Sequence, residues 1–150
     1  MPTATRALWA RTKIRLWPER YRLVSLPVDR WPEVLAWAAT VPAGFGAVVR
    51  ERDEVSLTAE AGAWEASPLR SLALHVSAPY RALTLDLELE LSVVGYLAPA
   101  ALRLAQAGIS IVPQCAFLRD HLLVREEDAE DARAVLEAYA QECRAATPSE

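Results

Sequence analysis

The sequence predicts an α+β fold made of two ferredoxin-like halves in tandem, with an antiparallel or mixed sheet and helices on one face. A strand–helix–strand–strand pattern occurs twice along the 150 residues, and a closing helix follows the second occurrence. Helices separate some of the strands whereas hairpins join others, which is typical of α+β folds. The chain is 53% hydrophobic and 24% charged, the composition of a folded globular protein rather than a disordered one.

The first half is expected over residues 11–78, after an N-terminal arm of residues 1–10. Its strands are predicted from alternating apolar and polar residues, and its helix from Asp29, a residue type that caps helices, followed by Pro32 in the first turn. The predicted elements are strands at 12–17 and 21–28, a helix at 31–39, a hairpin over 45–60, an irregular segment at 61–70 and a strand at 71–77.

The second half is expected over residues 80–142, before a C-terminal tail of residues 143–150. Its last helix begins at the acidic stretch EEDAED, which is favourable at a helix N-terminus, and carries an apolar stripe at spacings of three and four. The predicted elements are a strand at 81–91, a helix at about 97–107, a strand at 108–114, a loop over 115–119, a strand at 121–125 and the closing helix.

Charge is unevenly distributed along the chain. Residues 1–30 carry seven basic and two acidic side chains, whereas the whole chain has a net charge of −4. A basic arm suggests nucleic acid as a partner. However, Arg11, Lys13 and Arg15 alternate with less polar residues, as on the solvated face of a half-buried strand. We therefore expect no nucleic-acid partner.

Several other function classes are disfavoured. No apolar run approaches the ~20 residues that span a bilayer, and the N-terminus lacks the apolar core of a secretory signal, so we expect a cytoplasmic protein with no membrane partner. Cys115 and Cys143 lie far apart without a CxxC motif, which fits neither a zinc site nor a disulfide framework. We expect both to be reduced, with no metal and no cofactor.

A catalytic site is also not expected. His75 and His121 are widely separated, without an accompanying acidic pattern, and are interpreted as structural. A nucleophile cluster of Cys115, His121 and Asp120 is conceivable, but adjacent residues on a strand point to opposite faces, which disrupts the required geometry. The sequence contains no glycine-rich phosphate loop and no nucleophile elbow.

Four segments carry a family resemblance: RYRLVSLPVD (20–29), FGAVVRERDEVSLTAE (45–60), GYLAPAALRLAQAGISI (95–111) and AFLRDHLLVREEDAEDA (116–132). They resemble the small tandem ACT-domain proteins, and are similar to cytosolic arginine-sensor proteins and to aspartokinase regulatory regions. Together they cover roughly residues 11–142. Two stretches depart from the family pattern: LELEL stands at 87–91, where members often have Gly-Pro-Leu-Asp-Phe, and Cys115-Ala116 replaces Ser-Thr.

The resemblance implies an amino-acid-binding site around Gly95. This glycine precedes a helix N-terminus, where backbone N–H groups and the helix dipole favour an anion such as a carboxylate. The resemblance places Asp120 beside this turn, where it would receive the ligand's ammonium group, with Phe117 as a wall. Further contacts are expected from Val94, Tyr96 and Leu97, and from Ser56, Leu57 and Thr58 of the first half at the interface between the halves.

A plainer interpretation is that Gly95 is only a turn residue and Asp120 only caps a loop amide. The leading functional hypothesis is a non-enzymatic sensor for a small amino acid, acting through a homodimer or higher homo-oligomer or through a separate protein partner. The second is a structural or protein-interaction module whose pocket is vestigial. The third, an enzyme acting on an amino-acid-like substrate, lacks an acid–base pair in the sequence.

Overall fold

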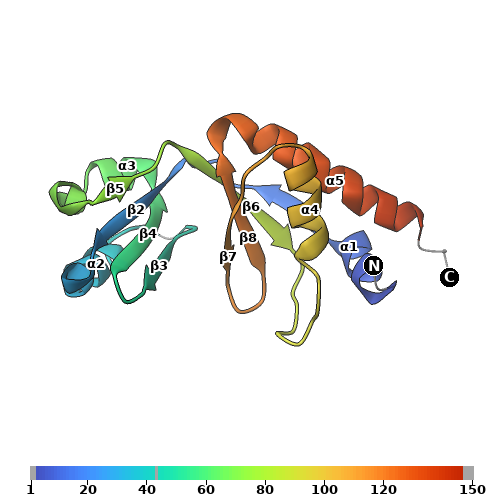
Figure 1. Ribbon diagram of the computed structural model, residues 1–150, viewed down its shortest axis with the longest axis horizontal. Helices are drawn as coiled ribbons and strands as arrows, with labels where there is room; N and C mark the ends of the chain where they lie inside the picture. The colour runs from blue at the N-terminus through green and yellow to red at the C-terminus, as the bar shows by residue number, and fades with distance from the viewer. Residues whose placement is uncertain (1–2, 43, 147–150) are drawn as a thin grey trace. The chain divides into compact units, whose positions relative to one another are not determined.

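A computed structural model describes residues 3–42 and 44–146 of the chain (Figure 1). The chain divides into two compact units. The insertion unit is Pro18–Tyr80, and the split unit consists of the residues up to Trp17 together with those from Arg81 onward. Among the described residues, no helix is both long and apolar enough to cross a membrane.

The insertion unit is a continuous βαββαβ segment. Its strands follow the order β5-β2-β4-β3, and every pairing in this path is antiparallel. Counted along the chain, β2, β3, β4 and β5 are the first, second, third and fourth strands of this unit. The fourth strand pairs with the first, the first with the third and the third with the second, which is the ferredoxin-like arrangement. The elements are β2 (Tyr21–Pro27), η1 (Val28–Arg30), α2 (Trp31–Ala38), β3 (Ala47–Arg50), β4 (Glu54–Glu60), α3 (Ala61–Glu65), η2 (Pro68–Leu72) and β5 (His75–Val76).

The split unit has the same arrangement with a different chain order. Its strands follow the order β1-β6-β8-β7, so the position of the fourth strand is filled by β1 from the beginning of the chain. β1 pairs antiparallel with β6, placing Lys13 opposite Asp86 and Leu16 opposite Leu83. The elements are α1 (Thr3–Arg11), β1 (Lys13–Leu16), β6 (Tyr80–Asp86), α4 (Ala98–Gln106), β7 (Val112–Cys115), β8 (Asp120–Arg125), η3 (Glu126–Asp128) and α5 (Ala129–Ala145).

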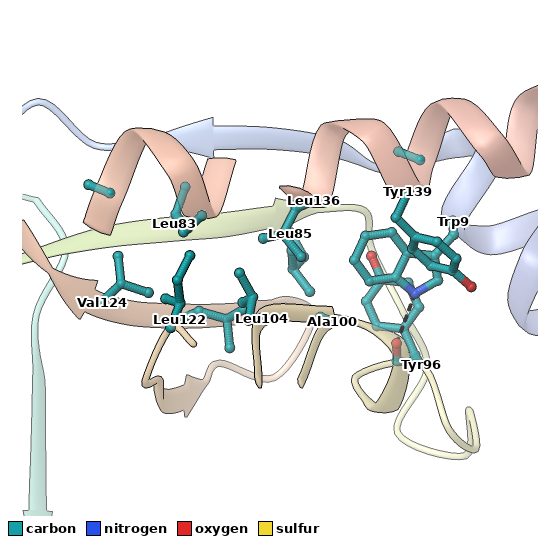
Figure 2. Close-up of a cluster of buried hydrophobic side chains, with 14 of the residues drawn as sticks. Trp9, Leu83, Leu85, Tyr96, Ala100, Leu104, Leu122, Val124, Leu136 and Tyr139 are labelled. Carbon is teal, nitrogen blue, oxygen red and sulfur yellow. Dashed lines mark hydrogen bonds between the residues drawn. The ribbon is translucent and has the colours of Figure 1, made fainter. Parts of the chain in front are cut away.

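The core of the split unit lies between its sheet and its helices (Figure 2). Successive side chains of a strand point to opposite faces, so Leu83 and Leu85 of β6 face the same way. They pack with Leu122 of β8, with Leu104 of α4 and with Leu136 of α5, all fully buried. The helices therefore cover one face of this sheet, as predicted.

The core of the insertion unit is built in the same way. Leu26 of β2 and Val55 of β4 are fully buried and pack against Val34 of α2 and Trp64 of α3. Trp37 of α2 meets Trp64 edge-on, with ring centroids 6.2 Å apart. The prediction of two ferredoxin-like halves, each with helices on one face, is confirmed.

The structure corrects the expected boundaries at both ends of the chain. The segment expected as an N-terminal arm (1–10) forms most of α1, which packs against α5, and Trp9 is fully buried. The expected first half (11–78) loses its opening residues to the split unit, because β1 pairs with β6. Helix α5 continues to Ala145, and Cys143 lies on its buried face. The expected boundary at 143 between the second half (80–142) and the tail (143–150) therefore falls inside a helix. Residues 1–2 and 147–150 lie outside the described residues.

Several elements of the insertion unit also differ from expectation. The segment 61–70, expected to be irregular, contains α3, because both carboxylate oxygens of Glu60 accept hydrogen bonds from the backbone of Gly62 and Ala63. The expected strand 71–77 is reduced to His75–Val76, since the preceding residues continue the 3-10 turn η2. Asp29 lies within η1, and no side chain caps α2.

Two strands of the split unit are shorter than predicted. The alternating stretch 81–91 leaves the sheet after Asp86, because Leu87 folds back to donate its N–H to the carbonyl of Leu85 at 2.9 Å. The expected strand 108–114 begins only at Val112 and extends to Cys115. The result is a long loop over 87–97, which forms one wall of the site described below.

A matched pair of leucines on α4 tests the core. Leu104 is fully buried, whereas Leu102 on the same helix is 57% exposed. We predict that Leu104→Ala lowers the free energy of unfolding by about 2–5 kcal/mol, because the substitution leaves a cavity. Leu102→Ala should change it by no more than about 0.5 kcal/mol. Urea unfolding of both variants measures the difference, and equal effects would contradict this packing.

Candidate functional site

A pocket of about 300 Å³ opens in the split unit between the 87–97 loop and the β7–β8 turn. Three charged side chains, Glu90, Arg119 and Asp120, lie among mostly apolar ones. We call it the Gly95 pocket. Its lining residues are Leu89, Glu90, Leu91, Val93, Gly95, Tyr96, Leu97, Ala98, Cys115, Ala116, Phe117, Leu118, Arg119 and Asp120.

The turn before α4 forms one side of the pocket. Gly95 has φ +78°, a conformation that favours glycine, and a Cβ placed there would meet no atom within 4 Å. Leu97 is the N-cap of α4, and no side chain caps this helix end. Pro99 has no N–H, whereas Ala98, the first residue of α4, is exposed and lines the pocket, so its amide is a helix-end donor at the pocket wall.

Asp120 also lines the pocket, from the first position of β8. It pairs with Cys115 in the β7–β8 ladder and is half-buried. Within residues 3–42 and 44–146, Asp120 takes part in no ion pair. Burial and a hydrogen bond to the Asp120 carboxylate raise the pKa of the Cys115 thiol to about 11. The thiol is therefore protonated at neutral pH and is a poor nucleophile.

Arg119 ties the two walls of the pocket together. Its guanidinium donates to Asp86 through Nε and to Glu88 through Nη2, both at 2.8 Å. These hydrogen bonds raise the pKa of Arg119. The Leu89 N–H also donates to the carbonyl of Leu118 at 3.0 Å. Because Arg119 is engaged by two acids, the charge that remains available inside the pocket is negative, which favours a cationic group.

Tyr96 forms the inner wall and is 3% exposed. Its hydroxyl lies 2.7 Å from the Thr12 Oγ1, and its backbone carbonyl accepts a hydrogen bond from the Trp9 indole at 2.9 Å. Burial raises the pKa of Tyr96 to about 12, and the negative charge of Asp120 contributes to the increase. Helix α1 is thereby attached directly to the wall of the pocket.

The rim of the pocket is apolar and open to solvent. Leu91 is 74% exposed and Phe117 is 73% exposed, and both line the pocket. Val94 is 83% exposed next to the Gly95 turn. Large apolar side chains at such exposure form a surface suited to an apolar ligand group or to another protein.

The structure brings together five of the residues predicted for the site. Gly95, Tyr96, Leu97, Phe117 and Asp120 line one pocket, although 21 residues of chain separate Phe117 from Gly95. Val94 does not line it.

The three residues predicted from the first half lie on β4 of the insertion unit. Leu57 and Thr58 are both 2% exposed, and they line a separate pocket of about 320 Å³ within that unit. Ser56 pairs with Ser25 and Val49 in the sheet. Their contribution to an amino-acid site stays a prediction.

Sequence reasoning missed Trp9, Thr12 and Arg119 as residues that shape the pocket. The sequence did contain a signal for Arg119, namely the acidic residues that alternate over 86–90. Where these acids leave the strand and lie close together, a basic side chain is needed to balance their charge. In the structure Thr5, Trp9 and Thr12 are all buried. Their spacings of four and three are those of one helix face, which was the available signal for a helix in the supposed arm. Nothing local in the sequence indicated that this helix would meet Tyr96.

His121 points away from Asp120, as expected from strand geometry. Its Nδ1 lies 2.9 Å from the Thr84 Oγ1, which also accepts a hydrogen bond from the Trp17 indole at 2.8 Å. Burial lowers the pKa of His121, and the nearby Arg15 lowers it further, against the opposing effect of Asp120. The described residues contain no cluster of three or more potential metal ligands.

The lowered pKa of His121 predicts a specific pH dependence of stability. The unfolded chain binds the proton more readily than the folded chain, so folding stability falls as the pH drops below the unfolded histidine pKa of about 6.5. His121→Gln retains a hydrogen-bonding group without this titration. Chemical unfolding between pH 8 and pH 5 should therefore show a smaller loss for the variant, with parallel profiles above about pH 7. Identical slopes below that pH would contradict the assignment.

No family model and no curated protein matches the chain. A Vibrio cholerae protein of unknown function, described as a possible transport protein, is 26% identical with a TM-score of 0.72, over 91% of this chain and 95% of that one. An Agrobacterium tumefaciens protein is 23% identical with a TM-score of 0.69, over 86% and 89%. The regulatory subunit of aspartate kinase from Thermus flavus is 14% identical with a TM-score of 0.62, over 84% and 95%.

These similarities establish the fold. The chain has the tandem ferredoxin-like architecture of aspartokinase regulatory subunits, and the similarity extends over nearly the whole length of the Thermus flavus subunit. The resemblance to aspartokinase regulatory regions expected from the sequence is thus confirmed. At 14% identity the likeness concerns architecture, so the function has to be argued from the pocket.

Proposed function

We propose that this chain is a non-enzymatic regulatory module that binds a free amino acid in the Gly95 pocket. One observation carries the proposal: the start of α4, which no side chain caps and which follows a positive-φ glycine, lines the same pocket as Asp120, a carboxylate that makes no ion pair within the described residues. These two features have opposite electrostatic preferences, and they share a pocket of about 300 Å³. A zwitterion satisfies both at once.

The ligand would be oriented by its two charged groups. Its carboxylate would approach the Ala98 amide and the positive end of the α4 dipole, a favourable location for an anion. Its ammonium group would meet Asp120 in a charge-assisted hydrogen bond. Its side chain would then extend along the apolar rim at Leu91 and Phe117. Gly95 permits the close approach because it carries no Cβ.

The chemistry of the pocket favours binding over catalysis. The Cys115 thiol has a raised pKa and is not activated, and the His121 ring is hydrogen-bonded to Thr84. The fold shared with aspartate kinase regulatory subunits supports a regulatory role. Ligand binding would regulate by favouring one of two arrangements of the protein, with the output passing to a partner or to an oligomer.

A specific observation also supports the alternative, a protein-interaction module with a vestigial pocket. Leu91 and Phe117, which line the pocket, and Val94, next to the Gly95 turn, are all more than 70% exposed. Such a rim would be covered in a complex. A thermal-shift screen of the protein amino acids separates the two functions, because a ligand at ~100 times its Kd adds ~2.7 kcal/mol of stability. An interaction module would give no shift with any amino acid.

We predict that the chain forms a homo-oligomer, most simply a two-fold dimer. β3 and β7 are edge strands of their units, and such edges tend to pair or to be covered. The exposed rim around the Gly95 pocket adds apolar surface to be buried. Sedimentation or solution scattering should give a mass of at least two chains at micromolar concentration. The mass of a single chain throughout that range would contradict the prediction.

Asp120→Asn should remove most of the binding while preserving the fold. A charge-assisted hydrogen bond contributes roughly 1.5–3 kcal/mol, so affinity should fall on the order of 10- to 100-fold. Asp131→Asn makes the same chemical change at an exposed position of α5 and should leave affinity unchanged. Calorimetric titration with the amino acid that gives the largest thermal shift measures both variants.

Two glycine variants complete this experiment. Gly95 and Gly108 have similar positive φ values, and a Cβ at either position meets no atom within 4 Å. Gly95→Ala and Gly108→Ala should therefore share a similar backbone strain of roughly 1 kcal/mol. Only Gly95→Ala adds a methyl group where the ligand carboxylate would approach. If Asp120→Asn and Gly95→Ala both bind like the wild type, the amino acid is bound elsewhere.

A further inference from the structure

Helix α1 is attached to the Gly95 pocket by a buried tryptophan. Trp9 is fully buried, and its indole donates a 2.9 Å hydrogen bond to the carbonyl of Tyr96 (Figure 2). The two rings also stack, with centroids 5.3 Å apart and planes 23° apart. A backbone carbonyl in a turn has no ladder partner to fix it, so the indole hydrogen bond constrains the path of the chain between Gly95 and α4.

A second buried contact, from Thr12 directly after the end of α1, holds the ring of the same residue. The Thr12 side chain is 1% exposed, and its hydroxyl lies 2.7 Å from the Tyr96 hydroxyl. The Thr12 hydroxyl also donates to the carbonyl of Leu8 at 3.0 Å, so its remaining capacity is that of an acceptor for the tyrosine hydroxyl. α1 and the residue directly after it therefore bind both the backbone and the hydroxyl of Tyr96, which lines the pocket.

The other contacts of α1 connect it to α5. Trp9 meets Tyr139 edge-on, with ring centroids 5.0 Å apart, and Tyr139 carries the Arg103 guanidinium over its ring at 4.6 Å. Arg103 in turn pairs with Glu142. Trp9 thus lies between the pocket turn on one side and α5 on the other, which makes α1 an intermediate between the pocket and the C-terminal helix.

We propose that Trp9 and Thr12 are positioning residues that hold the Gly95–Ala98 turn in its binding conformation, so that docking of α1 and occupation of the pocket favour one another. The ligand part of this inference rests on the proposed amino-acid binding, whereas the positioning part does not. Coupling between two binding events is reciprocal. A docked α1 therefore raises ligand affinity, and a bound ligand strengthens the docking of α1.

Hydrogen exchange of the ligand-free, full-length chain tests the positioning role. Trp9→Phe keeps an aromatic ring but removes the indole N–H, and Thr12→Val keeps the shape but removes the hydroxyl. Each should raise the exchange rates of the Tyr96, Leu97 and Ala98 amides roughly 3- to 10-fold relative to amides of β8, as expected for one lost buried hydrogen bond. The two variants are independent, so a folding failure of one leaves the other to decide.

Leu83→Val is the matched control. Leu83 belongs to the same core but lies at the end away from Tyr96 in Figure 2. Shortening it destabilises the unit without touching the turn, so the exchange rates of the turn and of β8 should rise together. A selective rise at the turn in Trp9→Phe and Thr12→Val, and not in Leu83→Val, supports positioning. Unchanged turn rates in both variants would overturn it.

The ligand arm uses an equimolar mixture of the protein amino acids as the probe. In the wild type, the mixture should slow exchange both at the Gly95–Ala98 turn and in α1, and Trp9→Phe should weaken binding roughly 3- to 10-fold. Protection of the turn without protection of α1 would overturn the coupling while leaving the proposed function standing. Absence of protection anywhere in the wild type would overturn the proposed function and the coupling together, and the ligand-free exchange would still decide the positioning role.

Discussion

Antiparallel pairing of β1 with β6 is the constraint on which the rest of the split unit depends. It brings residues from the beginning of the chain to the strand position that would otherwise be filled after α5, completing the ferredoxin-like sheet. The same pairing sets α1 beside α5 and directs Trp9 onto Tyr96. Without it the sheet would lose a strand, and the turn at the pocket would lose the indole that holds its backbone.

The candidate site follows from where the two adjacent strands of that sheet end. β6 stops at Asp86 and β8 begins at Asp120, so the loops that precede α4 and β8 meet at one end of the sheet. Arg119 joins them by binding two acids, and Asp120 lines the same pocket as the uncapped start of α4. The pocket thus combines a group that favours an anion with one that favours a cation, which is the electrostatic requirement for holding a zwitterion.

The sequence predicted the features that depend on local patterns. Alternation in β6, the helix between Gly95 and Gly108 and the position of Asp120 all follow from residues near each other in the chain. The sequence did not predict that β1 is the fourth strand of the split unit. A four-residue strand such as KIRL carries no information about its partner strand, which lies about 70 residues further along the chain. The stretch 87–91 alternates like a strand, yet it leaves the sheet and Glu88 binds Arg119, 31 residues further along the chain. In both cases a long-range contact decided what local propensity could not.

The proposed function depends on the binding of a free amino acid in the Gly95 pocket of the split unit. Amide chemical-shift mapping, during titration with the amino acid that most stabilises the chain, tests this binding directly. The mapping reports on the backbone amides of the whole chain in one experiment. Binding in the Gly95 pocket should give the largest shifts at Gly95, Ala98 and Asp120, with smaller ones in α1. Shifts confined to the pocket around Leu57 and Thr58 in the insertion unit, or absent at saturating concentration, would contradict it.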